Sequence, residues 1–264
     1  MGRAAPAVSA RVVAFTREVP RTIAECELTH VAREPIDVAA ARAEHAAYER
    51  ALADARCEVR RLADDDDHPD AVFVEDTAVV LDELAVLARP GAASRRGEID
   101  TVADALGTLR PLARIDAPAT LDGGDVLRVG RRIWVGVGGR TSAEGAAQLR
   151  AHAAPLGYDV RAVATRGCLH LKSAVTAVAD DLLLVNPDWV DADVFGLRTL
   201  AVDPAEPFAA NALLVSGRVL HGAHFARTRR RLEAAGVRVV PVPAEELAKA
   251  EGGVTCGSIL VTVP

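Results

Sequence analysis

One order of elements recurs along this chain: two apolar runs joined by a short polar turn, then an amphipathic stretch, then a third apolar run. It is clearest from Ala71, where AVFVEDTAVVLDELAVLARP predicts two strands with a turn at Asp82-Glu83. SRRGEIDTVADALGTL follows with helical spacing, and RPLARI predicts another strand. Each such unit would place a hairpin and a returning strand in one small sheet.

The same order returns further along the chain. DVLRVGRRIWVGVG predicts a hairpin that turns near Gly130-Arg131, and the segment 141–144, TSAE, reads as a capping box that opens a helix. Two later hairpins are expected to turn at 180–181 and at Ser216-Gly217.

The two ends of the sequence fit the pattern less well. The segment before Ala71 looks like an incomplete copy, with strands at 11–15 and 57–62 around a helix from about 37 to 55. At the other end, a short helix is expected before a strand that carries Cys256. About five units of roughly 40 to 50 residues favour radial repetition over one open sheet. Radial closure would let side chains far apart in sequence meet near the axis.

Composition excludes several classes of protein. The 264 residues are half apolar and carry a net charge of −6, which argues against nucleic acid as a partner. No apolar run approaches the length of a membrane span, and MGRAAPAVSARVVAF has no long apolar region of a secretory signal. The four cysteines are widely spread, which favours free thiols and a cytoplasmic location.

Polar groups interrupt runs that are otherwise apolar. Glu75 and Asp76 occur in FVEDT, which we expect to be a strand; Asp122 precedes a glycine pair; His170 lies between two leucines; and Cys256 follows Gly-Gly-Val-Thr. Burial of such groups without partners costs several kcal/mol. Each has an ordinary explanation alone: a strand pair facing opposite sides, a turn aspartate, a hydrogen-bonded core histidine and a small buried cysteine.

Two groups of potential metal ligands occur in the sequence. His221 and His224 are three residues apart, and Asp67, His68 and Asp70 lie close together. Neither group has a third convincing ligand at the usual spacing. We therefore expect no metal and no cofactor.

Five motifs in order carry a family resemblance: PDAVFVEDTAVV, ARPGAASRRGE, TLDGGDVLRVG, LHLKSAV and VTCGSIL. This series resembles that of the dimethylarginine dimethylaminohydrolases, over roughly residues 11–261. The resemblance implies the fold of the guanidine-modifying superfamily, a five-bladed α/β propeller of ββαβ units around a central active site, as one catalytic domain over 1–264. Gly257 and Thr77 depart from what relatives often carry and put the shape of the pocket in doubt.

The resemblance also implies a reaction, hydrolysis of an N-methylated arginine to citrulline and a methylamine. Cys256 would attack the guanidinium carbon as a thiolate and form a covalent thiouronium intermediate. His170 would protonate the leaving amine and then activate water, and Asp122 would orient His170. Asp76 would accept paired hydrogen bonds from the guanidinium.

The remaining expected contacts surround the substrate. By resemblance, Asp70 and Glu75 complete the acidic pocket, and Arg95 and Arg140 bind the substrate carboxylate. Ile23 corresponds to the apolar residue of a lid.

Acidic neighbours and a glutamate just upstream, Glu251, predict that the thiol of Cys256 is largely protonated until a guanidinium cation binds. The expected partner is a small-molecule guanidino amino acid, bound by a monomer or homodimer.

Four alternatives remain open from the sequence. The protein could be an arginine deiminase-like hydrolase, or another guanidine hydrolase that acts on a different substrate such as agmatine. It could also be a non-catalytic binding protein of the same fold, like the ribosome anti-association factor, or a regulatory protein that binds an amino acid.

Overall fold

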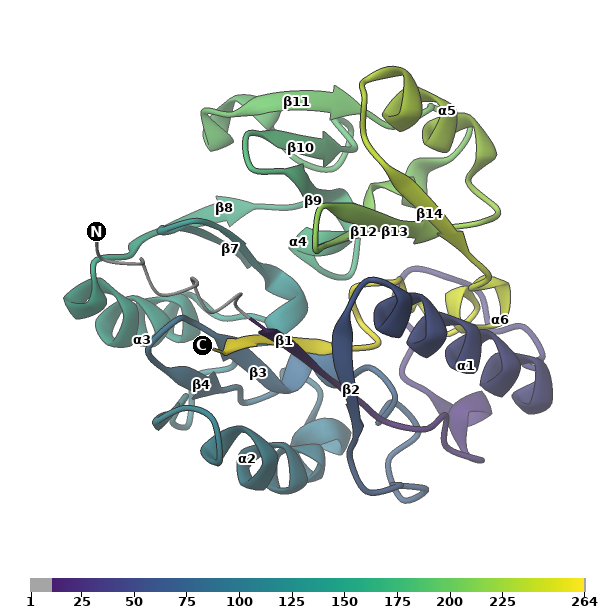
Figure 1. Ribbon diagram of the computed structural model, residues 1–264. Helices are drawn as coiled ribbons and strands as arrows, with labels where there is room; N and C mark the ends of the chain where they lie inside the picture. The colour runs from purple at the N-terminus through teal and green to yellow at the C-terminus, as the bar shows by residue number, and fades with distance from the viewer. Residues whose placement is uncertain (1–10, 264) are drawn as a thin grey trace, which may run out of the picture.

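The computed structural model describes residues 11–263, which form five three-stranded sheets arranged as blades around a common centre (Figure 1). The strands are β1 (Arg11–Thr16), β2 (Cys57–Arg61), β3 (Ala78–Val80), β4 (Ala85–Leu87), β5 (Leu112–Arg114), β6 (Val126–Val129), β7 (Arg132–Val137), β8 (Asp159–Ala164), β9 (Val175–Ala179), β10 (Leu182–Val185), β11 (Arg198–Ala201), β12 (Ala212–Val215), β13 (Arg218–Gly222), β14 (Val239–Val242) and β15 (Ile259–Val263). The α-helices are α1 (Val38–Asp54), α2 (Ile99–Gly107), α3 (Ala143–Ala153), α4 (Leu171–Ala174), α5 (Ala226–Ala234) and α6 (Glu245–Ala248).

Every blade has the same topology. In the blade β3-β4-β5, the middle strand pairs antiparallel with the first strand and parallel with the third. A tight turn can join only antiparallel strands, whereas a parallel pair needs a crossover, here supplied by α2. The predicted ββαβ unit and the five-bladed α/β propeller are therefore confirmed.

The fifth blade uses both ends of the described chain. Its order is β15-β1-β2, with Val13 opposite Val261 and Val12 opposite Cys57. The N-terminal segment is incomplete as a copy because β15 supplies its first strand. This pairing closes the ring, as Figure 1 shows near its centre.

Local sequence explains the turns and helix starts. Ser216 and Gly217 both adopt positive φ, 48° and 70°, as a two-residue hairpin turn of the I′ type requires. The expected capping box is different in the structure: α3 is capped by Ser142, whose side chain accepts from the Gly145 amide, and Thr141 lies one residue earlier.

Two segments predicted as strands form turns instead. Val74–Thr77 is a 3₁₀ helix, which the Thr77 hydroxyl stabilises by donating to the Val74 carbonyl. Cys256 lies in a turn before β15 and not on the strand. The Glu75 amide donates to the Cys256 carbonyl at 3.1 Å, so these two turns are joined to each other.

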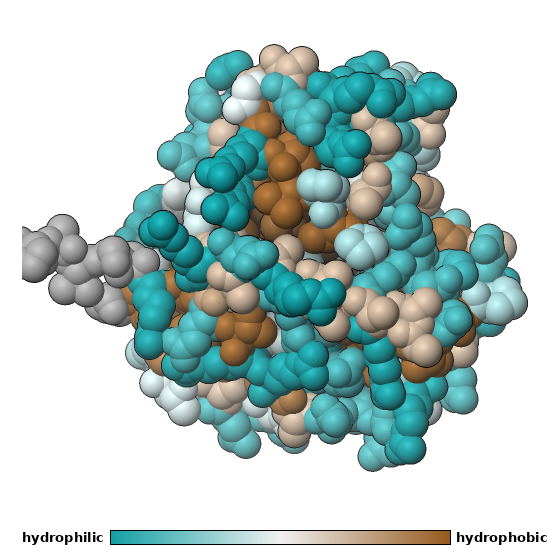
Figure 2. Space-filling view, turned by 45° about the vertical axis from the view of Figure 1, so that its right-hand side comes forward, coloured by the Kyte–Doolittle hydropathy of each residue, from teal (hydrophilic) through white to brown (hydrophobic). Residues whose placement is uncertain are grey.

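The first strand of each blade faces the common axis. Residues from β3, β6, β9, β12 and β15 line a cavity of about 280 Å³, called here the axial cavity, together with Glu75, Gly123, Lys172, Thr255 and Ser258. One face of the molecule has an apolar hollow with a hydrophilic rim (Figure 2). No helix within residues 11–263 is long and apolar enough to cross a bilayer.

Candidate active site

A second cavity gathers most of the residues singled out in the sequence. It is called here the cysteine cavity, and its lining is Glu27, Asp70, Phe73, Asp76, Arg95, Arg140, Leu169, His170, Ala250, Glu251, Gly252 and Cys256. These residues come from loops and short helices of different blades. They precede the first strand or follow the middle strand of a blade, so the cavity lies at the ends of the hairpins opposite their turns. The structure thus brings Cys256 and His170, 86 positions apart in the sequence, to one cavity.

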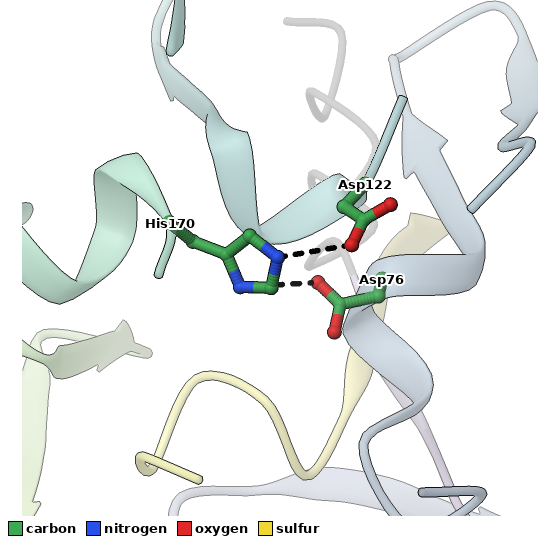
Figure 3. Close-up of side chains that lie close together, drawn as sticks. All are labelled: Asp76, Asp122 and His170. Atoms are coloured by element: carbon green, nitrogen blue, oxygen red, sulfur yellow. Dashed lines mark hydrogen bonds and ion pairs between the residues drawn. The ribbon is translucent and has the colours of Figure 1, made fainter. Parts of the chain in front are cut away.

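His170 lies between two carboxylates (Figure 3). Its Nε2 is 3.0 Å from Oδ2 of Asp122, and its Nδ1 is 3.7 Å from Oδ1 of Asp76. The other oxygen of Asp122 accepts the Gly91 amide at 2.8 Å. Asp122 is fully buried and fixed at both oxygens, so it can hold the imidazole in one orientation.

The glycine pair after Asp122 is needed for this packing. A Cβ at Gly123 would lie 2.0 Å from the Glu75 carbonyl oxygen. A Cβ at Gly124 would lie 2.7 Å from both Oδ1 of Asp76 and Nδ1 of His170. Glycine therefore allows the backbone to approach the carboxylate and the imidazole, and the Gly124 amide donates to Asp76 at 2.9 Å.

The charges of this group favour an imidazolium. Burial alone would lower the pKa of His170, but Asp76, the hydrogen bond to Asp122, and Asp125 outweigh burial and raise the pKa to about 9. Burial would raise the pKa of Asp76, but His170 and Arg95 lower it to about 2. At neutral pH the histidine carries a proton that it can donate.

Cys256 has the opposite tendency. Its side chain is buried, with 9% of the residue exposed, and the Gly253 amide donates to Sγ at 3.4 Å. Burial, followed by the charges of Glu75 and Asp76, raises the pKa of the thiol to about 12. The shifted pKa values thus favour a neutral thiol and a charged imidazole in the lining of one cavity. Ionisation of the thiol on substrate binding stays a prediction.

Glu75 does not line the cysteine cavity and lines the axial cavity instead. Its carboxylate pairs with Lys172 at 2.6 Å and accepts the Thr255 hydroxyl at 2.7 Å. The 3₁₀ helix turns successive side chains to different sides, so Glu75 and Asp76 face different cavities. Glu75 therefore contacts the loop that carries Cys256 through Thr255.

Arg95 lines the cysteine cavity, but most of its donors are used within the protein. Its guanidinium donates to Oδ2 of Asp76 at 2.6 Å and to both oxygens of Glu98 at 2.9 Å. It also donates to the backbone carbonyl oxygens of Phe73 and Asp70. This geometry makes Arg95 a support for Asp76, and its expected contact with a substrate carboxylate stays a prediction.

Arg140 is half-buried and lines the same cavity, and its Nη2 donates to Oγ1 of Thr29 at 3.3 Å. Asp70 lines the cavity and accepts the Glu27 amide at 3.0 Å. Ile23 is fully buried in an apolar cluster that includes Cys256 and Phe73, but it does not line the cavity.

Sequence reasoning assigned no role to two buried acids of this centre. Asp125 accepts the Leu171 amide at 2.9 Å, and burial raises its pKa to about 6. Glu98 is the main partner of Arg95, three residues away. The DGGD pattern and the i, i+3 spacing were the available signals.

One cluster has the spacing of a metal site. Asp76, Asp122 and His170 each offer a ligand atom, all within 4.8 Å of one another. Gly124 and Arg95 already donate to Asp76, and Gly91 and His170 already donate to Asp122. These contacts are those of two carboxylates that stabilise a charged imidazole. The absence of a metal stays a prediction.

The groups weighed as metal ligands in the sequence have other contacts. Nε2 of His221 lies 2.9 Å from the Ala209 carbonyl oxygen, and Nδ1 of His68 lies 2.8 Å from Asp65. Neither histidine belongs to a three-ligand group within residues 11–263.

Comparison with known proteins adds a family. No protein-family model matches the chain. It is 42% identical over 247 residues to the N(G),N(G)-dimethylarginine dimethylaminohydrolase of Streptomyces coelicolor, covering 93% of this chain and 95% of that protein. It is 35% identical over 226 residues to the protein of the same name from Pseudomonas aeruginosa, covering 84% and 89%.

Solved structures agree with these relatives. The Pseudomonas aeruginosa enzyme, as a cysteine-to-serine mutant complexed with citrulline, superposes with a TM-score of 0.89 at 32% identity, covering 94% of this chain and 98% of that one. The N-terminal domain of the cyanobacterial arginine dihydrolase ArgZ superposes at 0.85 with 20% identity over 97% and 99%, which shows the fold alone. The identity to the curated relatives over most of both lengths shows that this chain belongs to the dimethylarginine dimethylaminohydrolase family.

Proposed function

We propose that this protein hydrolyses an Nω-methylated L-arginine to citrulline and methylamine or dimethylamine. The observation that carries the proposal is the cysteine cavity, where a thiol, an imidazolium and a buried carboxylate meet in a member of this family. A planar guanidinium needs a strong nucleophile and a proton donor for its leaving amine, and both groups line this cavity.

Substrate binding prepares the nucleophile. A guanidinium beside Asp76 offsets the negative charges that raise the pKa of Cys256, so the thiol releases its proton to solvent. Each oxygen of Asp76 already accepts one hydrogen bond and keeps a second lone-pair direction for a guanidinium N–H.

The first half-reaction forms a carbon–sulfur bond. The Cys256 thiolate attacks the guanidinium carbon, and the resulting tetrahedral adduct expels the methylated nitrogen. His170 gives its proton to that nitrogen, which leaves as the neutral amine. The product of this step is a thiouronium bound to Cys256, next to a neutral His170.

The second half-reaction restores the protein. Neutral His170 takes a proton from water, and the hydroxide oxygen attacks the thiouronium carbon. The carbon–sulfur bond then breaks, and the hydroxyl group of the adduct gives its proton to the departing sulfur. The products are the neutral thiol of Cys256 and the urea group of citrulline. Asp122 keeps Nε2 of His170 in place through both halves.

The other predicted side chains divide into contacts and supports. We infer that Asp70 and Arg140 meet the amino-acid end of the substrate, since both line the same cavity as Cys256 and His170. Arg95 and Glu75 support the centre, Arg95 by holding Asp76 and Glu75 by accepting Thr255. Ile23 packs behind the cavity with Phe73.

The wider biological setting is proposed on less direct grounds. We infer one catalytic domain over 1–264, because five blades share one ring, although residues 1–10 and 264 lie outside the described structure. Four free cysteines among the described residues support a cytoplasmic location. A monomer or a homodimer fits a cavity whose lining comes from one chain.

A substrate comparison tests the function. Purified protein is offered L-arginine, Nω-methyl-L-arginine, asymmetric dimethyl-L-arginine and agmatine, and citrulline or carbamoylputrescine is assayed. Methylated arginines should give citrulline with the highest kcat/KM, and Cys256→Ser should release citrulline more slowly by on the order of a thousandfold or more. Preferred turnover of arginine or agmatine would replace the proposed substrate, and binding without turnover would support a binding protein.

A further inference from the structure

The carboxylate of Glu251 accepts three consecutive backbone N–H groups. Thr29 donates to Oε2 at 2.7 Å, and His30 and Val31 donate to Oε1 at 2.6 Å and 3.1 Å. Such bonds to a charged acceptor are stronger than neutral ones. Glu251 therefore holds a segment, 29–31, that lies more than 200 positions earlier in the sequence.

The backbone of Glu251 is unusual. Its φ is +56°, in the left-handed region that glycine or asparagine adopts more easily. It precedes Gly252 and Gly253 at the start of the loop that carries Cys256. A glutamate in a costly conformation is explained by what its carboxylate holds.

Segment 29–31 in turn contacts a residue expected to bind substrate. Oγ1 of Thr29 accepts a hydrogen bond from Nη2 of Arg140 at 3.3 Å. Arg140 and Glu251 both line the cysteine cavity. A continuous path of hydrogen bonds thus runs from Glu251, at the start of the loop that carries Cys256, through Thr29 to Arg140.

We propose that Glu251 is a positioning residue for recognition of the substrate α-carboxylate. Its three amide bonds fix segment 29–31, and Thr29 then sets the guanidinium of Arg140 for that carboxylate. The inference rests on the proposed function, because it assigns Arg140 to the amino-acid end. It makes Glu251 a determinant of substrate affinity, while the reacting atoms remain those of Cys256 and His170.

Binding measurements separate this role from a general structural one. In Cys256→Ser protein, calorimetry gives dissociation constants for Nω-methyl-L-arginine and for Nω-methylagmatine, which lacks the carboxylate. Glu251→Gln places an amide donor against an N–H group, and Glu251→Gly removes the carboxylate while suiting the positive φ. Both should weaken Nω-methyl-L-arginine about tenfold and Nω-methylagmatine less than twofold.

The hydrogen bond between Thr29 and Arg140 can be tested with an isosteric variant. Thr29→Val removes the acceptor for Arg140 and should produce the same selective loss of affinity. Thr29→Ser keeps the hydroxyl and should bind both ligands like the parent. The double variant Thr29→Val/Glu251→Gln should lose no more than either single variant, because both act on one path. Thermal unfolding of each variant reports whether the fold is kept.

Three results would overturn the inference: equal losses for both ligands, no loss for either, or additive losses in the double variant. Absence of binding by either ligand to the parent would remove both the inference and the proposed function. Selective losses in a protein whose wild-type form hydrolyses no guanidine would remove only the proposed function.

Discussion

Glu75 and Asp76 are neighbours in sequence, yet they face different cavities. Asp76 lines the cysteine cavity, where Arg95 and His170 surround it and its pKa falls to about 2. Glu75 lines the axial cavity, where Lys172 and Thr255 are its partners. The same type of group thus contributes to two regions of different character, one with several buried charges and one lined mainly by apolar strands.

The comparison shows where the fold concentrates its electrostatic cost. Asp76, Asp122, Arg95, Glu98 and His170 are all nearly inaccessible to solvent. Buried charges of this kind add little net stability, and removing one partner is costly. Their concentration around one cavity is therefore better explained by chemistry than by folding. In the axial cavity, the pair Glu75–Lys172 joins two of the lining residues.

The largest predicted effect separates the reacting cysteine from other buried cysteines. Cys256→Ser should lower kcat on the order of a thousandfold or more, because serine is a far weaker nucleophile here. Cys57→Ser is the matched control, since Cys57 is buried in β2 and lines neither cavity. Citrulline release measures both; equal activity of the two variants would contradict the assignment.

The second prediction tests the two neighbouring acids directly. Asp76→Asn should reduce kcat/KM about a hundredfold and destabilise the fold by about 3 kcal/mol, because Arg95 and His170 each lose a buried partner. Glu75→Gln should cost about 1 kcal/mol and less than a tenfold loss of kcat/KM. Urea unfolding and steady-state kinetics measure these changes. Similar values for both variants would show that Asp76 and Glu75 do not differ in role.

The third prediction concerns pH and stability. The pKa of His170 is raised from 6.5 to about 9, so the protonated form stabilises the fold. This contribution, on the order of 3 kcal/mol, is fully present below pH 6.5 and lost as pH rises through 9. The unfolding free energy of wild type should therefore fall relative to His170→Gln over this window; parallel curves would exclude the effect.

The fourth prediction concerns the thiol. The pKa of Cys256 is raised to about 12, and a guanidinium bound beside Asp76 should lower it. The difference in thiolate absorbance between wild type and Cys256→Ser isolates this group from the other cysteines. Its midpoint should move to lower pH when an uncleaved guanidinium ligand is added, and an unchanged midpoint would refute substrate-assisted ionisation.

The smallest predicted effect lies outside both cavities. Asp37 caps α1 by accepting the amides of Ala39 and Ala40. Asp37→Ala should cost about 1 kcal/mol of unfolding free energy and leave kcat/KM unchanged. A loss of kcat/KM would contradict the prediction, because it would show that a contact outside both cavities affects catalysis.

Local patterns were sufficient to predict the blades. Polar turns such as Ser216-Gly217 separate apolar runs, and helical spacing marks the crossovers, so the order of elements follows from short-range chemistry. The family resemblance supplied the roles expected of Cys256, His170 and Asp122, and the structure brings the first two to one cavity.

Long-range pairing was beyond the reach of those patterns. The apolar run around FVEDT predicted a strand, but bonds to Cys256 and within the turn favour a 3₁₀ helix, in which Glu75 faces the axial cavity. The resemblance made Arg95 a substrate-binding arginine. Its burial against Glu98 and Asp76 was not predictable, because it depends on how the turn before β3 packs against the connection between β4 and β5. The contact between Glu251 and segment 29–31 likewise depends on ring closure.

The strand β15 both completes the blade that begins with β1 and follows directly after Cys256. During synthesis, a ribosome makes β1 long before β15, so the blade β15-β1-β2 stays incomplete until the other four have been made. Cys256 is made just before β15, the strand that completes this blade. Enzymatic competence should accordingly appear late in folding, and a nascent chain would carry no assembled thiol chemistry before its architecture is complete.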